Sequence, residues 1–246
     1  MRAKLQKFTE FANTLLPHET AYLLRIEQFE DPIRRAILEQ VDFNCRNIHQ
    51  FTPYDESLDK RKYSNLKNWI VDRLKSMDVD EHFEWMSDLE RKISTDSILP
   101  AEEKELLRAV KKYQHPGFYF TKFYELLIQY RHFLQIRLRY SDHRIISQFI
   151  ETYSKAYQHS NQINQQMHAA TQDIVGQYAQ NNAESRHWEQ WITEVFEDES
   201  LDGKNRYMAL IRLIFIGFNY RKFEPLIDKF DYLDESFKDG LYYSKR

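Results

Sequence analysis

The sequence contains few of the residues that make turns, disulfides or phosphate-binding loops. Only five Gly and six Pro occur in 246 residues, which argues against turn-rich all-β folds and against glycine-lined phosphate loops. The single cysteine, Cys45, excludes an intrachain disulfide framework and agrees with a reducing compartment. A nucleotide-binding fold of the Gly-rich type is therefore not expected.

The chain also lacks an excess of one charge and any long hydrophobic run. Its net charge of −3 comes from 35 basic and 38 acidic residues mixed along the chain, so no global field favours nucleic acid or an anionic membrane. The longest uncharged apolar run, residues 213–218, is far shorter than the roughly 20 residues of a membrane span. The amphipathic start of the chain has neither a secretory apolar region nor a small-residue cleavage site. We expect a soluble cytoplasmic protein without a membrane partner.

Aromatic residues, in contrast, are abundant. The chain is 15% aromatic, and its apolar residues recur at intervals of three and four, which predicts amphipathic helices almost throughout. The expected fold class is all-α, with about ten helices in antiparallel hairpins and a core of aromatic rings, Leu and Ile. The turn His115-Pro116-Gly117 is taken as the domain boundary. It separates an N-terminal helical region, 1–116, from a long-helix hairpin followed by further helices, 117–246.

One helix is expected to be very long. From His143 the pattern runs without a breaker to Gly176 or Gln180, which predicts a helix over about 143–180 and, at about 1.5 Å per residue, more than 50 Å in length. The aromatic helix before it is expected to pack back along it. Apolar residues alternate spacings of four and three, as in a coiled-coil seam. The seam residues are Phe149, Tyr153, Ala156, Ser160, Ile163, Met167, Ala170 and Ile174. A homo-oligomer through this seam is an open alternative, although Ser160 and the absence of Leu weaken it.

Two short segments share a pattern. "FTKFYELL" (120–127) and "YRKFEPLI" (220–227) both have the form aromatic-x-Lys-Phe-x-x-Leu-aliphatic. The second follows "MALIRLIFIG" and resembles the inter-helix turn of a tetratricopeptide-type helical repeat, with Phe223 where that family usually has Ala. The resemblance covers only the C-terminal part, about 35 residues, and the two segments do not follow the roughly 34-residue period of that repeat. It implies a solenoid-like C-terminus that binds other proteins, and no chemistry. The alternative is two amphipathic helix starts.

A Glu-x-x-His pair, Glu184 and His187, has the spacing of two metal ligands on a helix. Carboxylate-bridged di-metal bundles need two such pairs and two further Glu, and no other histidine has an acidic residue three positions before it. Asn181 as N-cap with Glu184 at the third helical position explains the segment as a capping box. We expect no metal and no cofactor. A helical-bundle metal protein or enzyme using Glu184 and His187 is the further alternative.

Nucleophilic catalysis is not indicated either. Cys45 has His49 four residues on, within reach on a helix. A reactive Cys usually lies at a helix start or in an exposed loop, where its pKa falls, whereas a mid-helix Cys more often fills a core. The chain is therefore expected not to be an enzyme.

The basic and aromatic run "YRHFLQIRLRYSDHR" (130–144) is the candidate interaction surface. Its arginines could contact phosphates while its rings stack on bases, or the arginine stems could cover apolar surface of the helix pair. The acidic stretch 194–202 suggests a charge-patterned protein surface instead. We expect a non-enzymatic scaffold or protein–protein interaction module, with a nucleic-acid-associated helical protein using 130–144 as the alternative. The candidate surface residues are Arg131, Arg137, Arg139, Tyr140 and Arg144.

Overall fold

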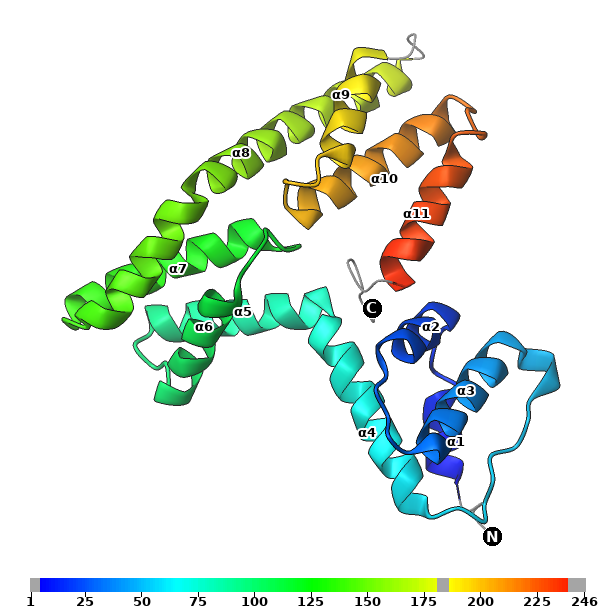
Figure 1. Cartoon of the computed structure of the whole chain (residues 1–246). Helices are drawn as coiled ribbons and strands as arrows, with labels where there is room; N and C mark the ends of the chain where they lie inside the picture. Colours follow the sequence, from blue (N-terminus) through cyan, green and yellow to red (C-terminus); the bar gives the residue numbers. More distant parts are fainter. Residues whose placement is uncertain (1–4, 181–185, 239–246) are drawn as a thin grey trace. The chain divides into compact units, whose positions relative to one another are not determined.

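A computed structural model describes residues 5–180 and 186–238 (Figure 1). In these ranges every regular element is a helix, with eleven α-helices, one 3-10 helix and no strand. The all-α fold and the single long helix are thus confirmed. That helix, α8, spans Tyr140–Ala179 and has 40 residues, so it begins three residues before the expected start at His143. None of the described helices is both long and apolar enough to cross a membrane.

The chain divides into two compact units. The first contains residues 1–81 together with 232–246, and the second contains residues 82–231. The boundary expected after residue 116 lies inside the second unit. There the turn at 115–117 joins two helices that contribute side chains to one core.

Proline or an aspartate N-cap marks the start of three helices of the first unit, α2 (Pro17–Ile26), α3 (Pro32–Arg46) and α4 (Lys60–Met77). Pro17 and Pro32 each occupy the first helical position, where a missing N–H costs nothing. Asp31 caps its helix by accepting a hydrogen bond from the Ile33 amide at 3.0 Å. Leu23, Leu38, Leu66 and Ile70 form the centre of a separate core. The unit also contains α1 (Gln6–Ala12) and the 3-10 helix η1 (Ile48–Gln50).

The first core of the second unit is aromatic. It is formed by α5 (Val79–Ser94), α6 (Pro100–Lys112), α7 (Phe120–Ile136) and the first half of α8. The Tyr124 ring stacks on Tyr157 with ring centroids 4.1 Å apart, and its hydroxyl donates to the Ile150 carbonyl at 2.9 Å. Because α7 ends at Ile136 and α8 begins at Tyr140, the chain reverses in a short turn, and α7 packs back along α8 as the sequence predicts (Figure 1).

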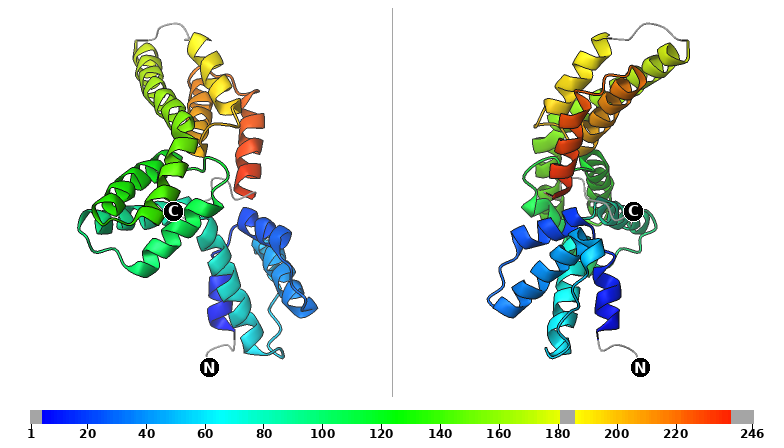
Figure 2. Two further views of the ribbon diagram at one scale, coloured as in Figure 1. Left: turned by 60° about the vertical axis from the view of Figure 1, so that its left-hand side comes forward. Right: turned by 90° about the vertical axis from the view of Figure 1, so that its right-hand side faces the viewer.

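The second core is formed by the other half of α8 with α9 (Arg186–Glu197) and α10 (Gly203–Asn219). The last helix is α11 (Leu226–Lys238). On α8 and α9, Asp173 accepts a hydrogen bond from Trp188 at 2.6 Å, which fits an antiparallel pair. On α8 and α10, two pairs fix the direction: Asn164 with Asn205, and Thr171 with Arg212. Both helices advance by seven residues between these pairs, so α8 and α10 run parallel. Figure 2 shows the three helices side by side.

The coiled-coil seam of α8 is covered by helices of the same chain. Its side chains pack against α7 in the first half and against α9 and α10 in the second. Ser160 is also buried, and its carbonyl accepts a hydrogen bond from the Asn205 side chain at 2.9 Å. The periodicity therefore records packing inside one chain.

Candidate interaction surfaces

The turn between α7 and α8, residues 136–140, reverses the chain in an unusual backbone conformation. We call this segment, "IRLRY", the hairpin tip. The Arg139 amide donates to the Leu134 carbonyl at 3.1 Å, and the Leu138 amide donates to the Gln135 carbonyl at 3.2 Å. These two hydrogen bonds make a Schellman motif, whose left-handed position is usually glycine. Here that position is Leu138, with φ of 55°.

Both arginines of the hairpin tip fold back and form ion pairs. Arg137 lies over the Phe133 ring, 3.7 Å from its centroid, and pairs with Asp96. Arg139 pairs with Glu103 and, at 2.7 Å, with Asp142. Two cations thus meet three carboxylates, so this cluster carries no excess positive charge.

The anchor of this cluster is buried. The Tyr130 hydroxyl, itself buried, donates to the Glu103 carboxylate at 2.6 Å. Burial is the main cause that raises the pKa of Tyr130, and the hydrogen bond to Glu103 and the negative charge of Glu103 raise it further. The phenol therefore remains protonated and holds Glu103 in place for Arg139.

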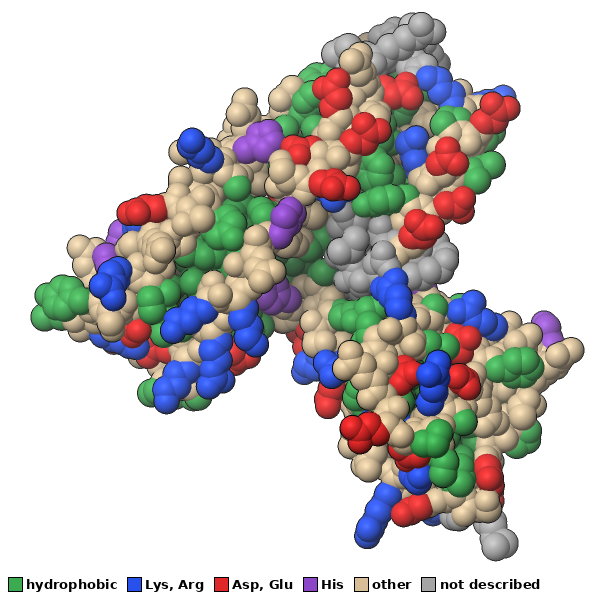
Figure 3. Space-filling model, in the orientation of Figure 1, with side chains coloured by type: hydrophobic (Ala, Val, Ile, Leu, Met, Phe, Trp, Pro, Cys, Tyr) green, Lys and Arg blue, Asp and Glu red, His purple; other side chains and the backbone are tan. Residues whose placement is uncertain are grey.

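Because the arginines turn inward, the apolar residues that alternate with them, Ile136, Leu138 and Tyr140, turn outward. Ile136 is 78% exposed, Leu138 66% and Tyr140 74%. Hydrophobic side chains are visible at this end of the α7–α8 hairpin (Figure 3). Large side chains exposed together on one turn are typical of contact sites.

The structure separates the five predicted surface residues into three groups. Arg137 and Arg139 form ion pairs within the unit, and Tyr140 is exposed on the hairpin tip. Arg131, half-buried on α7, and Arg144, exposed on α8, form no ion pair with other described residues. The sequence reasoning missed the apolar members of the tip, although the alternation of apolar residues and arginine in "IRLRY" was a usable signal.

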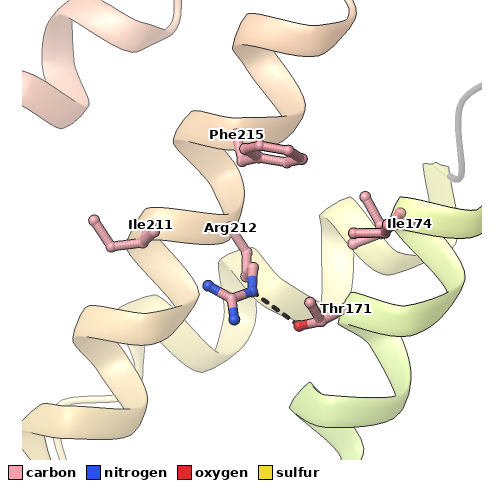
Figure 4. A pocket seen from close by; sticks show the side chains of 6 residues that line it. Thr171, Ile174, Ile211, Arg212 and Phe215 are labelled. Atoms are coloured by element: carbon pink, nitrogen blue, oxygen red, sulfur yellow. Dashed lines mark hydrogen bonds between the residues drawn. The ribbon is translucent and has the colours of Figure 1, made fainter. Parts of the chain in front are cut away.

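A second surface is an apolar groove between α8 and α10, with a volume of about 180 Å³ (Figure 4). We call it the α8–α10 groove. The Arg212 Nε donates to the Thr171 hydroxyl at 2.8 Å, and that hydroxyl donates to the Met167 carbonyl at 2.7 Å. Arg212 forms no ion pair with a described acidic residue. The groove is lined by Thr171, Ile174, Val175, Ile211, Arg212 and Phe215.

The turn between α10 and α11 carries the segment with the repeat-like pattern. Phe223 lies exposed in this turn, before the start of α11. The buried position is taken by Leu226, which packs against Gly217 of α10. A Cβ atom at Gly217 would come 2.6 Å from Leu226 Cδ2, so the close approach of the two helices depends on glycine.

The metal and nucleophile candidates gain no support from the described geometry. Asn181 and Glu184 lie outside the described residues, as does the side chain of His187. In the part of the chain that the structure describes, no group of three or more His, Cys, Asp or Glu side chains could hold a metal ion. The Cys45 thiol is half-buried and donates to the Leu15 carbonyl at 3.0 Å. Burial, with a contribution from Asp42, raises the pKa of this thiol, which disfavours the nucleophilic thiolate.

Comparison of the chain with protein-family models, with curated proteins and with solved structures finds no match. The hairpin tip and the α8–α10 groove are the two surfaces that bear on function.

Proposed function

We propose that this chain is a non-enzymatic helical interaction module whose hairpin tip binds a partner protein. The observation that carries the proposal is the exposure of Ile136, Leu138 and Tyr140 on one turn. A cluster of apolar and aromatic anchors that enters a pocket supplies most of the binding energy in many protein interfaces. The partner proposed is a protein with an apolar pocket able to take these three side chains.

The charges at the hairpin tip favour a protein over nucleic acid or an anionic membrane. Nucleic-acid affinity depends on cations that neutralise phosphates, and each Lys or Arg near an anionic membrane adds only about 1 kcal/mol. Arg137 and Arg139 are already neutralised by carboxylates. In the nucleic-acid alternative, the residues still available to contact phosphates and bases are Arg131, Arg144 and the Tyr140 ring.

The arrangement of α8, α9 and α10 supports the resemblance to a helical repeat. The three helices alternate in direction, and each packs on its neighbours in sequence. Stacking of helical hairpins against their neighbours is the principle of α-solenoids, which commonly bind other proteins. We propose a solenoid-like C-terminal region on this basis.

Photo-crosslinking followed by titration tests the hairpin tip. A photoreactive residue in place of Leu138 of the full chain is expected to give one discrete protein adduct in the cells of origin. Once that protein is purified, Ile136→Asp and Tyr140→Asp are each expected to weaken its Kd at least tenfold, which corresponds to about 1.4 kcal/mol. Leu16→Asp, at an exposed apolar residue of the first unit, is the matched control and should leave Kd unchanged.

Two other results would contradict the proposal. Salt-sensitive retention on heparin that Arg131→Ala and Arg144→Ala abolish would assign the surface to nucleic acid. Flotation with phosphatidylglycerol vesicles that Leu138→Asp abolishes would assign it to a membrane.

A further inference from the structure

We propose that the α8–α10 groove binds an amphipathic helix of a partner protein, and that a carboxylate of this helix pairs with Arg212. This surface is separate from the hairpin tip. Thr171 follows Tyr140 by 31 residues along α8, a distance of about 46 Å at 1.5 Å per residue. The two surfaces can therefore be tested independently.

The shape of the groove fits side chains of a helix better than a small molecule. Its volume of about 180 Å³ is below the roughly 300–1,000 Å³ of common ligand pockets. Its two walls are parallel helices, with Val175 exposed on one and Phe215 on the other. One turn further along each helix, Tyr178 and Phe218 are also exposed. Apolar side chains are thus exposed one turn beyond the groove residues on both helices, at the spacing of a helix with anchors one and two turns apart.

The positive charge of Arg212 in the groove favours a partner helix that carries a carboxylate. Arg212 is a cation among apolar side chains, held by one hydrogen bond from its Nε to Thr171. Its terminal nitrogens form no hydrogen bond with described residues, and Figure 4 shows the guanidinium group between the two helices. A guanidinium group matches a carboxylate with two parallel hydrogen bonds, and low-polarity surroundings strengthen such a pair. Since Thr171 already orients the side chain, little conformational freedom is lost on binding.

Selection from a displayed peptide library tests this proposal with the full chain. The library consists of helix-forming peptides with Leu or Phe at positions i, i+3 and i+7 and random residues between them. The unmodified chain is expected to enrich Asp or Glu at one random position at least tenfold over the starting library. Arg212→Glu is expected to reverse this preference to Lys or Arg at the same position. Arg212→Gln, which keeps a donor for Thr171, should abolish the acidic preference while apolar anchors are still selected.

The controls separate a specific pair from a general effect of charge or folding. Arg144→Glu makes the same charge change near the other end of α8 and should leave the acidic preference intact. Phe215→Lys should abolish selection, and circular dichroism checks that each variant keeps its helical content. An acidic preference that survives Arg212→Glu, or no enrichment at all, would overturn the proposal. Self-association of the unmodified chain that Arg212→Glu abolishes would assign the groove to a second copy and would also overturn it.

Discussion

Leu138 has a backbone conformation that most helix ends give to glycine. Among the residues that the structure describes, three non-glycine residues have positive φ, namely Asp96, Leu138 and Arg221. Each follows the C-cap of a helix that ends in a Schellman motif, so the scarcity of glycine in the sequence has a structural consequence. A left-handed non-glycine residue costs roughly 1–3 kcal/mol, and such strain tends to be retained at functional sites. At the hairpin tip, the strained residue is also a proposed contact.

Leu138→Gly is expected to make the protein more stable and to weaken partner binding. Relief of strain, roughly 1–3 kcal/mol, exceeds the roughly 0.5–1 kcal/mol lost to the greater freedom of glycine in the unfolded chain. Because the Leu138 side chain is largely exposed, little burial is lost. Urea unfolding should show a gain of about 1 kcal/mol, while titration of the partner shows a weaker Kd.

Arg221→Gly is the matched variant for this prediction. It relieves the same backbone conformation at the end of α10 and should raise stability without a change in partner affinity. If Leu138→Gly left both stability and affinity unchanged, neither the strain nor the contact assigned to Leu138 would hold.

At the scale of elements, the two glycines inside long helices have opposite roles. A Cβ atom at Gly176 of α8 meets nothing within 4 Å, whereas one at Gly217 of α10 would meet Leu226 Cδ2 at 2.6 Å and Cγ at 3.1 Å. Gly176→Ala is therefore expected to stabilise the protein by about 0.5–1 kcal/mol through helix propensity. Gly217→Ala is expected to destabilise it by about 1 kcal/mol, since overpacking costs roughly 1–3 kcal/mol and exceeds that gain.

Urea unfolding of the two variants side by side measures the difference. Equal stabilisation by both substitutions would show that α11 does not depend on close approach at Gly217.

The helices could be predicted from sequence because their signals are local. The seam of α8 is visible as a repeat of apolar residues, and Pro32 with Asp31 marks the start of α3. The inward turn of Arg137 and Arg139 could not be predicted in the same way. Their partners Asp96 and Glu103 lie more than thirty residues earlier in the chain, and only tertiary packing brings these charges together. The parallel pairing of α8 and α10, which forms the groove, also depends on contacts between distant residues.

At the scale of the whole molecule, the seam of α8 has two competing interpretations. In a self-associating coiled coil, the seam would pack against a second copy, and Ser160 would be its weak point. In the structure, the seam packs against α7, α9 and α10 of the same chain, and Ser160 is 1% exposed. Association through this seam would require these helices to separate and expose their cores.

Ser160→Leu distinguishes the two interpretations because they predict opposite results. A coiled-coil seam would gain an apolar contact, and a stronger dimer would result. In a filled intramolecular core the larger side chain would be overpacked, because Ser160 is 1% exposed and overpacking costs roughly 1–3 kcal/mol. We expect a monomer by light scattering after size exclusion, with a urea midpoint lower than that of the unmodified chain. Gln158→Leu, at an exposed position of the same helix, should leave the midpoint nearly unchanged, and a stable Ser160→Leu dimer would contradict the intramolecular interpretation.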